Sequence, residues 1–385
     1  MSNLLEILQN EFFQFPLENE TEDNFKKFIS QKLDSYIVLV NEIVDKDKND
    51  ILDKVTILSN TIKDSLQEYY NGFLNNAFTK ISNGFDSVKL EFNEINKYYN
   101  LTNNDYYRAR PSTEELDRKE MFHIPYEKRN IITNQRYSIA GFPCIYLGVT
   151  PYTCWEELNR PLPNNFTVSR VKLDKDIKIL NFAILPYEVK DDVYKHTRGY
   201  ANIEDRIDKY RDLLKSYLIC LPIIMACSVR VKDTKAPFRE EYIIPQMFTQ
   251  WIRLQGDIDG LQYYSTKTAT YSRRNPNLYR NIVIPTKETN LDRGHCKRLS
   301  ELITLTESIN CNDIELFSEN HDIDFSKITD QSNGLINMFS VEEIETKEGK
   351  KIVYQENSNG QIHYSSSGFM EIVSRLLDKD LGKIS

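Results

Sequence analysis

The stretch Cys144-Ile-Tyr-Leu-Gly-Val-Thr-Pro-Tyr-Thr-Cys-Trp-Glu-Glu-Leu158 decides how the central part of this chain is expected to fold. Its first half is a short apolar run, which predicts a buried strand over residues 145–149. Its second half predicts a turn and the start of a helix that places a glutamate, Glu156 or Glu157, at the end of the strand. Glutamates in such positions often take part in chemistry.

Short apolar runs separated by prolines and glycines lie on both sides of this stretch, from about Leu101 onward. This texture predicts a mixed α/β domain over residues 101–310. The strands expected there span residues 145–149, 167–173, 177–182, 223–231, 261–264 and 281–284. Helices are expected over residues 205–218 and after Pro245.

The first hundred residues differ, because apolar side chains recur there every three or four positions. We expect a helical bundle over residues 1–100, with three helices separated at residues 45–50 and 82–84 and a short leading helix near residues 4–13. Residues 311–385 predict a small β-meander with turns at 348–349 and 359–360, followed by a helix over residues 369–377. The fold class expected for the whole chain is therefore α+β.

Composition limits the class of protein. With 385 residues, a net charge of −8 and a pI near 5.4, the chain lacks the basic surface that general nucleic-acid or anionic-membrane binding needs. It shows no signal peptide and no apolar run long enough to span a bilayer, so we expect a cytoplasmic protein. The six cysteines form no Cys-x-x-Cys pair, which favours reduced core thiols over disulfides or zinc.

Three arginines beside tyrosines and serines precede the central stretch: Arg108, Arg110 and Arg136. A guanidinium can bind two phosphate oxygens at once, so the group indicates an anionic, phosphate-bearing substrate, although any single arginine is more often a salt-bridging residue. For the two glutamates, helix geometry allows only one to face a cleft. Acidic residues in a first helical turn are also ordinary helix stabilisers.

Two other sequence segments are better explained by a structural role than by a catalytic or metal-binding one. His123 lies beside Phe and Pro and is expected to be a packed or capping residue, and Asp257-Ile-Asp-Gly260 is expected to be a turn that opens a strand. The chain contains no Walker loop, Gly-x-Gly-x-x-Gly, Gly-x-Ser-x-Gly or His-Glu-x-x-His. The commonest NTPase, dehydrogenase, hydrolase and metalloprotease classes are therefore not indicated.

Four sequence segments, taken together, resemble the RES domain family. They are Tyr107-Arg-Ala-Arg110, Arg136-Tyr-Ser-Ile-Ala-Gly-Phe-Pro-Cys-Ile-Tyr-Leu-Gly148, Thr153-Cys-Trp-Glu-Glu157 and Asp259-Gly-Leu-Gln-Tyr-Tyr-Ser265. The resemblance covers about residues 101–310 and leaves the N-terminal bundle and the C-terminal tail unexplained. It implies a fold similar to that of ADP-ribosyltransferase toxins. It also implies a bacterial enzyme that breaks the nicotinamide–ribose bond of NAD⁺, with water or inorganic phosphate as acceptor.

The same resemblance implies roles for individual residues. Glu157 and Arg136 would be catalytic together with Ser265, and the residues that bind the substrate would be Arg108, Arg110, Tyr146 and Ser138. Two alternatives stay open, namely Glu156 in place of Glu157 and Arg110 in place of Arg108. The segment Gln135-Arg-Tyr-Ser138 departs from the glycine-rich motif that is usual in many members of the family. NAD⁺ is then the substrate, inorganic phosphate a co-substrate, and neither a cofactor nor a metal is needed.

Many members of the family are growth-arresting toxins. The resemblance therefore indicates a role as a toxin or in defence against phage, with an antitoxin or another regulatory protein as partner and with the N-terminal bundle as a regulatory or oligomerising part. A homo-oligomer is expected, and neither nucleic acid nor membrane is expected as a partner. Two further hypotheses remain: transfer of ADP-ribose onto a macromolecule, and a non-catalytic scaffold that binds a nucleotide.

Overall fold

The computed structural model describes residues 3–384 apart from residues 22, 100, 102–103, 268–275, 289–291, 320–322, 324–327, 329–333 and 347–348. The chain divides into two compact units. Unit 1 combines Met1–Leu101, Thr133–Ala140 and Ile179–Thr266, and unit 2 combines Thr102–Ile132, Gly141–Lys178 and Lys267–Ser385. Each unit is thus built from three separate segments. The expected division into residues 1–100, 101–310 and 311–385 stays a prediction.

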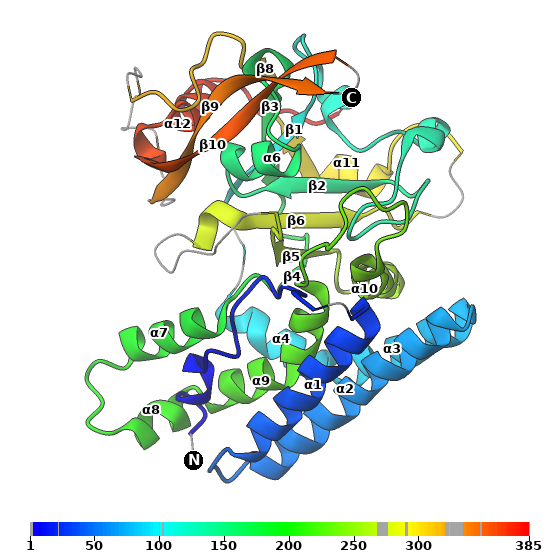
Figure 1. Cartoon of the computed structure of the whole chain (residues 1–385), viewed down its shortest axis with the longest axis vertical. Helices are drawn as coiled ribbons and strands as arrows, with labels where there is room; N and C mark the ends of the chain where they lie inside the picture. The colour runs from blue at the N-terminus through cyan, green and yellow to red at the C-terminus, as the bar shows by residue number, and fades with distance from the viewer. Residues whose placement is uncertain are drawn as a thin grey trace. The chain divides into compact units, whose positions relative to one another are not determined.

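Unit 1 is mainly helical (Figure 1). Its helices are α1 (Phe25–Asn41), α2 (Lys48–Tyr70), α3 (Leu74–Ser87), α4 (Lys89–Tyr98), α7 (Pro186–His196), α8 (Ile203–Lys209), α9 (Arg211–Cys227) and α10 (Ile243–Leu254), with the 3₁₀ turns η1 (Ile7–Gln9) and η4 (Glu240–Tyr242). Two short parallel strands, β4 (Ile179–Asn181) and β5 (Gly260–Tyr264), pair with Leu180 opposite Leu261. The short leading helix predicted near residues 4–13 is reduced to the single turn η1.

The break predicted at residues 82–84 is wrong, because Ser82 to Gly84 lie inside α3. Gly84 is instead a point where α3 approaches α2: a Cβ there would lie 2.7 Å from Cγ2 of Thr61. The break occurs earlier, at Gly72, whose φ of +85° ends α2 in the left-handed conformation that glycine accepts most readily. Two helices, α3 and α4, therefore stand where one was predicted.

The strand predicted over residues 223–231 is also wrong, because helix α9 continues to Cys227. Every residue from Ser216 to Cys227 is buried, so this segment has no polar face and its apolar run shows no helical period. Pro222 has no N–H to donate to the carbonyl of Leu218 four residues earlier. The hydroxyl of Tyr36 in α1 donates to that carbonyl at 2.8 Å and satisfies it.

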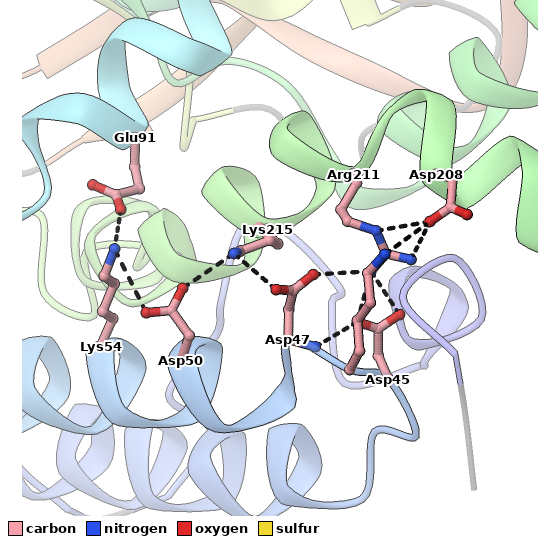
Figure 2. Close-up of polar contacts among 9 residues, drawn as sticks. Asp45, Asp47, Asp50, Lys54, Glu91, Asp208, Arg211 and Lys215 are labelled. Atoms are coloured by element: carbon pink, nitrogen blue, oxygen red, sulfur yellow. Dashed lines mark hydrogen bonds and ion pairs between the residues drawn. The ribbon is translucent and has the colours of Figure 1, made fainter.

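Oppositely charged side chains link α2 to the helices packed around it in unit 1, as Figure 2 shows. The loop before α2 supplies Asp45 and Asp47, whose carboxylates lie 2.7 and 3.0 Å from Nη1 of Arg211. The series continues through Lys215, which lies 3.2 Å from both Asp47 and Asp50. We call these residues, together with Lys54, Glu91 and Asp208, the charge network.

Unit 2 contains an antiparallel sheet in which β6, β2, β1, β3 and β7 lie in that order, with β8 also paired to β3. These strands are β1 (Asp105–Arg110), β2 (Cys144–Gly148), β3 (Thr167–Leu173), β6 (Arg280–Pro285), β7 (Ile303–Leu305) and β8 (Ile309–Asn310). Its helices are α5 (Arg118–Met121), α6 (Pro151–Glu157), α11 (Lys297–Leu302) and α12 (Gly368–Leu377), with the turns η2 (Tyr126–Ile131), η3 (Pro163–Asn165), η5 (Pro276–Tyr279) and η7 (Tyr364–Ser366). The mixture of helices and strands that was predicted is confirmed.

The C-terminal part of unit 2 is one long hairpin rather than the predicted meander. It consists of β9 (Leu335–Thr346) and β10 (Gly349–His363), which pair antiparallel and shift register between Glu356 and Gln361. The turn predicted at Asn359-Gly360 therefore falls within β10, at this irregularity. Of the turn predicted at residues 348–349, residue 348 lies outside the described residues. The helix predicted over residues 369–377 is confirmed as α12.

Candidate active site around Glu157

The helix α6 follows β2 after a tight connection that glycine makes possible. A Cβ on Gly148 would lie 2.7 Å from Sγ of Cys154 and 2.9 Å from the carbonyl oxygen of Thr150. The Thr150 hydroxyl caps the helix by accepting the N–H of Thr153 at 3.1 Å, and Pro151 occupies the first helical turn. This arrangement carries the chain from the end of β2 to Glu157 at the end of α6.

The two consecutive glutamates have different surroundings. Glu156 is 3% exposed; it accepts a hydrogen bond from the Tyr152 hydroxyl and another from Nε of Arg160, each at 2.9 Å. Burial raises the pKa of Glu156, and Arg160 opposes that effect. The Glu157 side chain is 30% exposed. Of the two carboxylates left open by the sequence, Glu157 is therefore the one that a solute can reach.

Two residues that the sequence did not single out contact Glu157. Asn281 in β6 is buried and donates its side-chain N–H to Oε1 of Glu157 at 2.8 Å. Lys267 has its Nζ 3.8 Å from Oε2 of Glu157; it also donates to the Glu157 carbonyl and, at 2.9 Å, to Oδ1 of Asn159. Asn281 stands as a polar residue within an apolar strand, and the segment Asn281-Ile-Val-Ile-Pro285 falls within the resemblance to the RES family, but neither observation gave Asn281 a role.

Arg108 and Arg110 lie on β1 and turn toward the same segment of unit 2. Arg108 is buried and donates to the carbonyl oxygens of Met121, of Phe122 at 3.1 Å and of Tyr146 at 2.9 Å. Burial, with the nearby Arg110 as a second cause, lowers the pKa of Arg108 to about 9. Arg110 donates to Phe122 at 2.7 Å, and its buried Nε has no hydrogen-bond partner among the described residues. Tyr146 itself is half-buried.

Arg136, Ser138 and Ser265 belong to unit 1. Arg136 is buried; its Nη2 donates to the Thr266 hydroxyl at 2.7 Å and its guanidinium lies 5.1 Å from the ring centre of Tyr242. Because Thr266 follows the fully buried Ser265, unit 1 brings Arg136 to the end of β5. Ser138 is buried in a turn closed by its hydrogen bonds with Gln135.

His123 is a packed residue, as predicted. Its Nε2 accepts the N–H of Cys296 at 2.8 Å, so its Nδ1 carries the proton that it donates to the carbonyl of Ile124, also at 2.8 Å. Burial lowers the pKa of His123 to about 3, helped by the nearby His295. In the neutral imidazole, both ring nitrogens are therefore hydrogen-bonded to backbone groups of the protein.

The remaining expectations concern thiols, turns and metals. All six cysteines are free and buried, which confirms the prediction of reduced core thiols. Asp257 and Asp259 lie directly ahead of β5, as the turn prediction required. Within the described residues, no group of three or more His, Cys, Asp or Glu side chains is arranged to hold a metal ion. None of the described helices has both the length and the apolar character needed to cross a bilayer.

These features define a mixed α/β protein in which a short helix presents a partly exposed carboxylate beside an antiparallel sheet. Over 305 residues the chain is 32% identical to a protein of Bacillus subtilis (strain 168) named "Putative toxin YopC", an alignment that covers 76% of this chain and 67% of that protein. The chain belongs to the same family as YopC. No protein-family model matches the chain, and no solved structure matches it, so its resemblance to the RES family stays a prediction.

Proposed function

We propose that this protein is a toxin that consumes NAD⁺ by cleaving the bond between nicotinamide and ribose. The toxin role is supported by the name of its relative YopC, and the chemistry is supported by the resemblance of its central words to the RES family. The acceptor of the ADP-ribosyl group is water or inorganic phosphate. Cleavage is assigned to Glu157.

The observation that carries this proposal is the state of the Glu157 carboxylate. Departure of nicotinamide leaves positive charge on the ribose, and a fixed carboxylate stabilises such an oxocarbenium-like transition state. Glu157 is exposed enough to meet a solute, and the Asn281 amide holds one of its oxygens. Glu156 cannot serve in the same way, because it is buried and its two oxygens accept hydrogen bonds from Tyr152 and Arg160 inside unit 2.

The diphosphate of NAD⁺ requires cationic hydrogen-bond donors. The two arginines of β1 differ in how many of their donors are already bonded to the protein. All three guanidinium nitrogens of Arg108 donate to protein carbonyls. Arg110 bonds one carbonyl and keeps a donor without a partner among the described residues, a state that a bound acceptor relieves. This favours Arg110 over Arg108 as a phosphate contact, and leaves Arg108 to fix β1 against residues 121–122.

Inducible expression in bacteria tests the toxin and the chemistry together. The wild-type protein is expected to arrest growth while cellular NAD⁺ falls, and Glu157→Gln is expected to do neither at equal abundance. Glu371→Gln is the matched control, since Glu371 is likewise a carboxylate of a unit 2 helix paired with a cation, Arg375, as Glu157 is paired with Lys267. Growth arrest by Glu157→Gln with the same loss of NAD⁺ would refute the assignment. Arrest without any loss of NAD⁺ by the wild type would refute the chemistry.

A further inference from the structure

The backbone directly after Glu157 adopts an unfavourable conformation. Asn159 and Arg160 have φ values of +61° and +60°, in the left-handed region that residues with a Cβ rarely occupy. Two such residues in a row persist only where surrounding contacts impose them. Here the Arg160 N–H donates to the carbonyl of Trp155 at 2.9 Å, which turns the chain back against α6.

In this conformation the side chain of Arg160 makes two contacts. Its Nε donates to the buried Glu156 carboxylate at 2.9 Å, and its guanidinium lies 4.2 Å from the ring centre of Phe339 in β9. Charge attraction and cation–π contact thus act on one guanidinium. We call Glu156, Arg160 and Phe339 the Arg160 cluster. It joins the last turn of α6 to the C-terminal hairpin.

The aromatic side chains of α6 pack against the same part of the chain. Trp155 is fully buried, and its ring centre lies between 5.2 and 5.7 Å from four aromatic rings: those of Phe317, Phe339, Tyr354 and Phe369. All four rings follow residue 310. In Figure 1 α6 is drawn beside β10 and α12, and Tyr152 adds a contact with Phe369 at 5.3 Å.

We propose that the C-terminal extension, residues 311–385, positions Glu157 for its reaction through the Arg160 cluster. The identity of the reaction rests on the proposed function. The role of the Arg160 cluster in holding α6 in place can be tested independently of it. A helix of seven residues has too few internal hydrogen bonds to fix its own last turn, so tertiary contacts must set the direction of Glu157. Arg160 is a positioning residue, since its guanidinium acts on Glu156 and the hairpin rather than on substrate.

The test compares Arg160→Gln with Arg375→Gln in the full-length protein. The two arginines match, because each follows its glutamate partner by four residues in unit 2 and their side chains are 30% and 39% exposed. Arg160 is bonded to Glu156 in α6, whereas Arg375 pairs with Asp313 and Glu371. Steady-state nicotinamide release is expected to show kcat about tenfold lower in Arg160→Gln with KM within about twofold, since a misplaced group loses rate more than binding. Arg375→Gln should match the wild type, and Arg160→Lys, which keeps the charge, should recover part of the rate.

Hydrogen–deuterium exchange supplies a readout that does not need activity. Amides of residues 151–160 are expected to exchange faster in Arg160→Gln than in Arg375→Gln or the wild type. Equal exchange in the three proteins, or an unchanged kcat in Arg160→Gln, would overturn the inference. Should Arg160→Gln fail to fold, Phe339→Leu removes the ring that Arg160 and Trp155 contact but keeps the Arg160–Glu156 pair, and it is expected to show the same two effects more weakly. A wild-type protein that releases no nicotinamide defeats the proposed function alone, and exchange then decides the positioning role.

Discussion

At the scale of single residues, burial separates chemical from structural roles more sharply than residue type does. Glu156 and Glu157 are neighbours in the chain, yet one carboxylate is paired inside unit 2 and the other is partly exposed. The sequence could show that only one of the two carboxylates faces a cleft, because consecutive helical residues point in different directions. It could not say which one, since that depends on Tyr152, Arg160 and a hairpin nearly two hundred residues away.

His123 gives a prediction about pH. Its pKa is about 3 in the folded protein and near 6.5 when unfolded, so between these values the unfolded state binds a proton that the folded state does not. The contribution of neutral His123 to the free energy of unfolding is fully present above about pH 6.5. As the pH falls below that value, the contribution decreases by at most about 1.4 kcal/mol per pH unit. His123→Gln, whose side-chain oxygen can still accept the Cys296 N–H, should lack this contribution.

Urea unfolding at several pH values measures it. The difference in free energy of unfolding between wild type and His123→Gln is expected to change by about 1 kcal/mol per pH unit from about pH 6 to about pH 4, in the direction that penalises the wild type at low pH. A difference that stays constant over this range contradicts the assignment of a neutral, buried imidazole.

At the scale of elements, helix α3 depends on a glycine for its approach to α2. Alanine is a better helix former than glycine by about 1 kcal/mol, yet a Cβ at residue 84 would overlap Cγ2 of Thr61. We expect Gly84→Ala to lower the free energy of unfolding by about 1 kcal/mol, because the cost of overpacking exceeds the gain in propensity. Thermal and urea unfolding, followed by circular dichroism, measure the change.

The matched control removes the methyl group that Gly84→Ala would meet. Thr61→Ser deletes Cγ2 and keeps the hydroxyl that donates to the Ile57 carbonyl at 2.8 Å. In that background Gly84→Ala is expected to be neutral or stabilising, so the sign of its effect reverses. A loss of the same size in both backgrounds would show that the contact with Thr61 is not the cause.

The elements also show what the sequence could and could not predict. Periodic helices such as α1 and α2, and strand β3, followed from local pattern. The helix α9 did not, because a segment buried on every side has no polar face to reveal its period. The prediction also missed β1, which carries Arg108 and Arg110, since its six residues include only three apolar ones. In the site, Asn281 and Lys267 were missed because their importance arises only from contact with Glu157.

At the scale of the whole molecule, segments far apart in sequence form each unit, and in unit 1 the charge network joins two of them, Met1–Leu101 and Ile179–Thr266. Asp45, whose side chain is 8% exposed, depends on Arg211 for its cationic partner. Arg211→Gln is expected to lower the free energy of unfolding by about 2 kcal/mol, since it leaves a nearly buried carboxylate without its cation. Lys46→Gln is the control: Lys46 also pairs with Asp208, at 3.5 Å, but is 67% exposed and should cost less than about 0.5 kcal/mol.

The same network predicts a dependence on acid. Partial burial alone would raise the pKa of Asp47, but hydrogen bonds from Lys215 and Arg211 outweigh it and lower that pKa below its usual value. The stabilisation from Asp47 is therefore present above about pH 4, the unfolded value, and is lost as the pH falls through the lower folded pKa. Urea unfolding should show the cost of Arg211→Gln shrinking in acid. Equal costs for Arg211→Gln and Lys46→Gln at neutral pH would contradict the role of the network.

The most direct test of the central claim is incubation of the purified full-length protein with NAD⁺, with and without inorganic phosphate, followed by chromatography and mass analysis of the products. The account predicts release of nicotinamide by the wild type and not by Glu157→Gln, together with free ADP-ribose or, if phosphate is the acceptor, its phosphorylated form. Label transferred from NAD⁺ to protein or nucleic acid would instead identify a macromolecular acceptor. NAD⁺ left intact by a folded wild-type protein would contradict the claim.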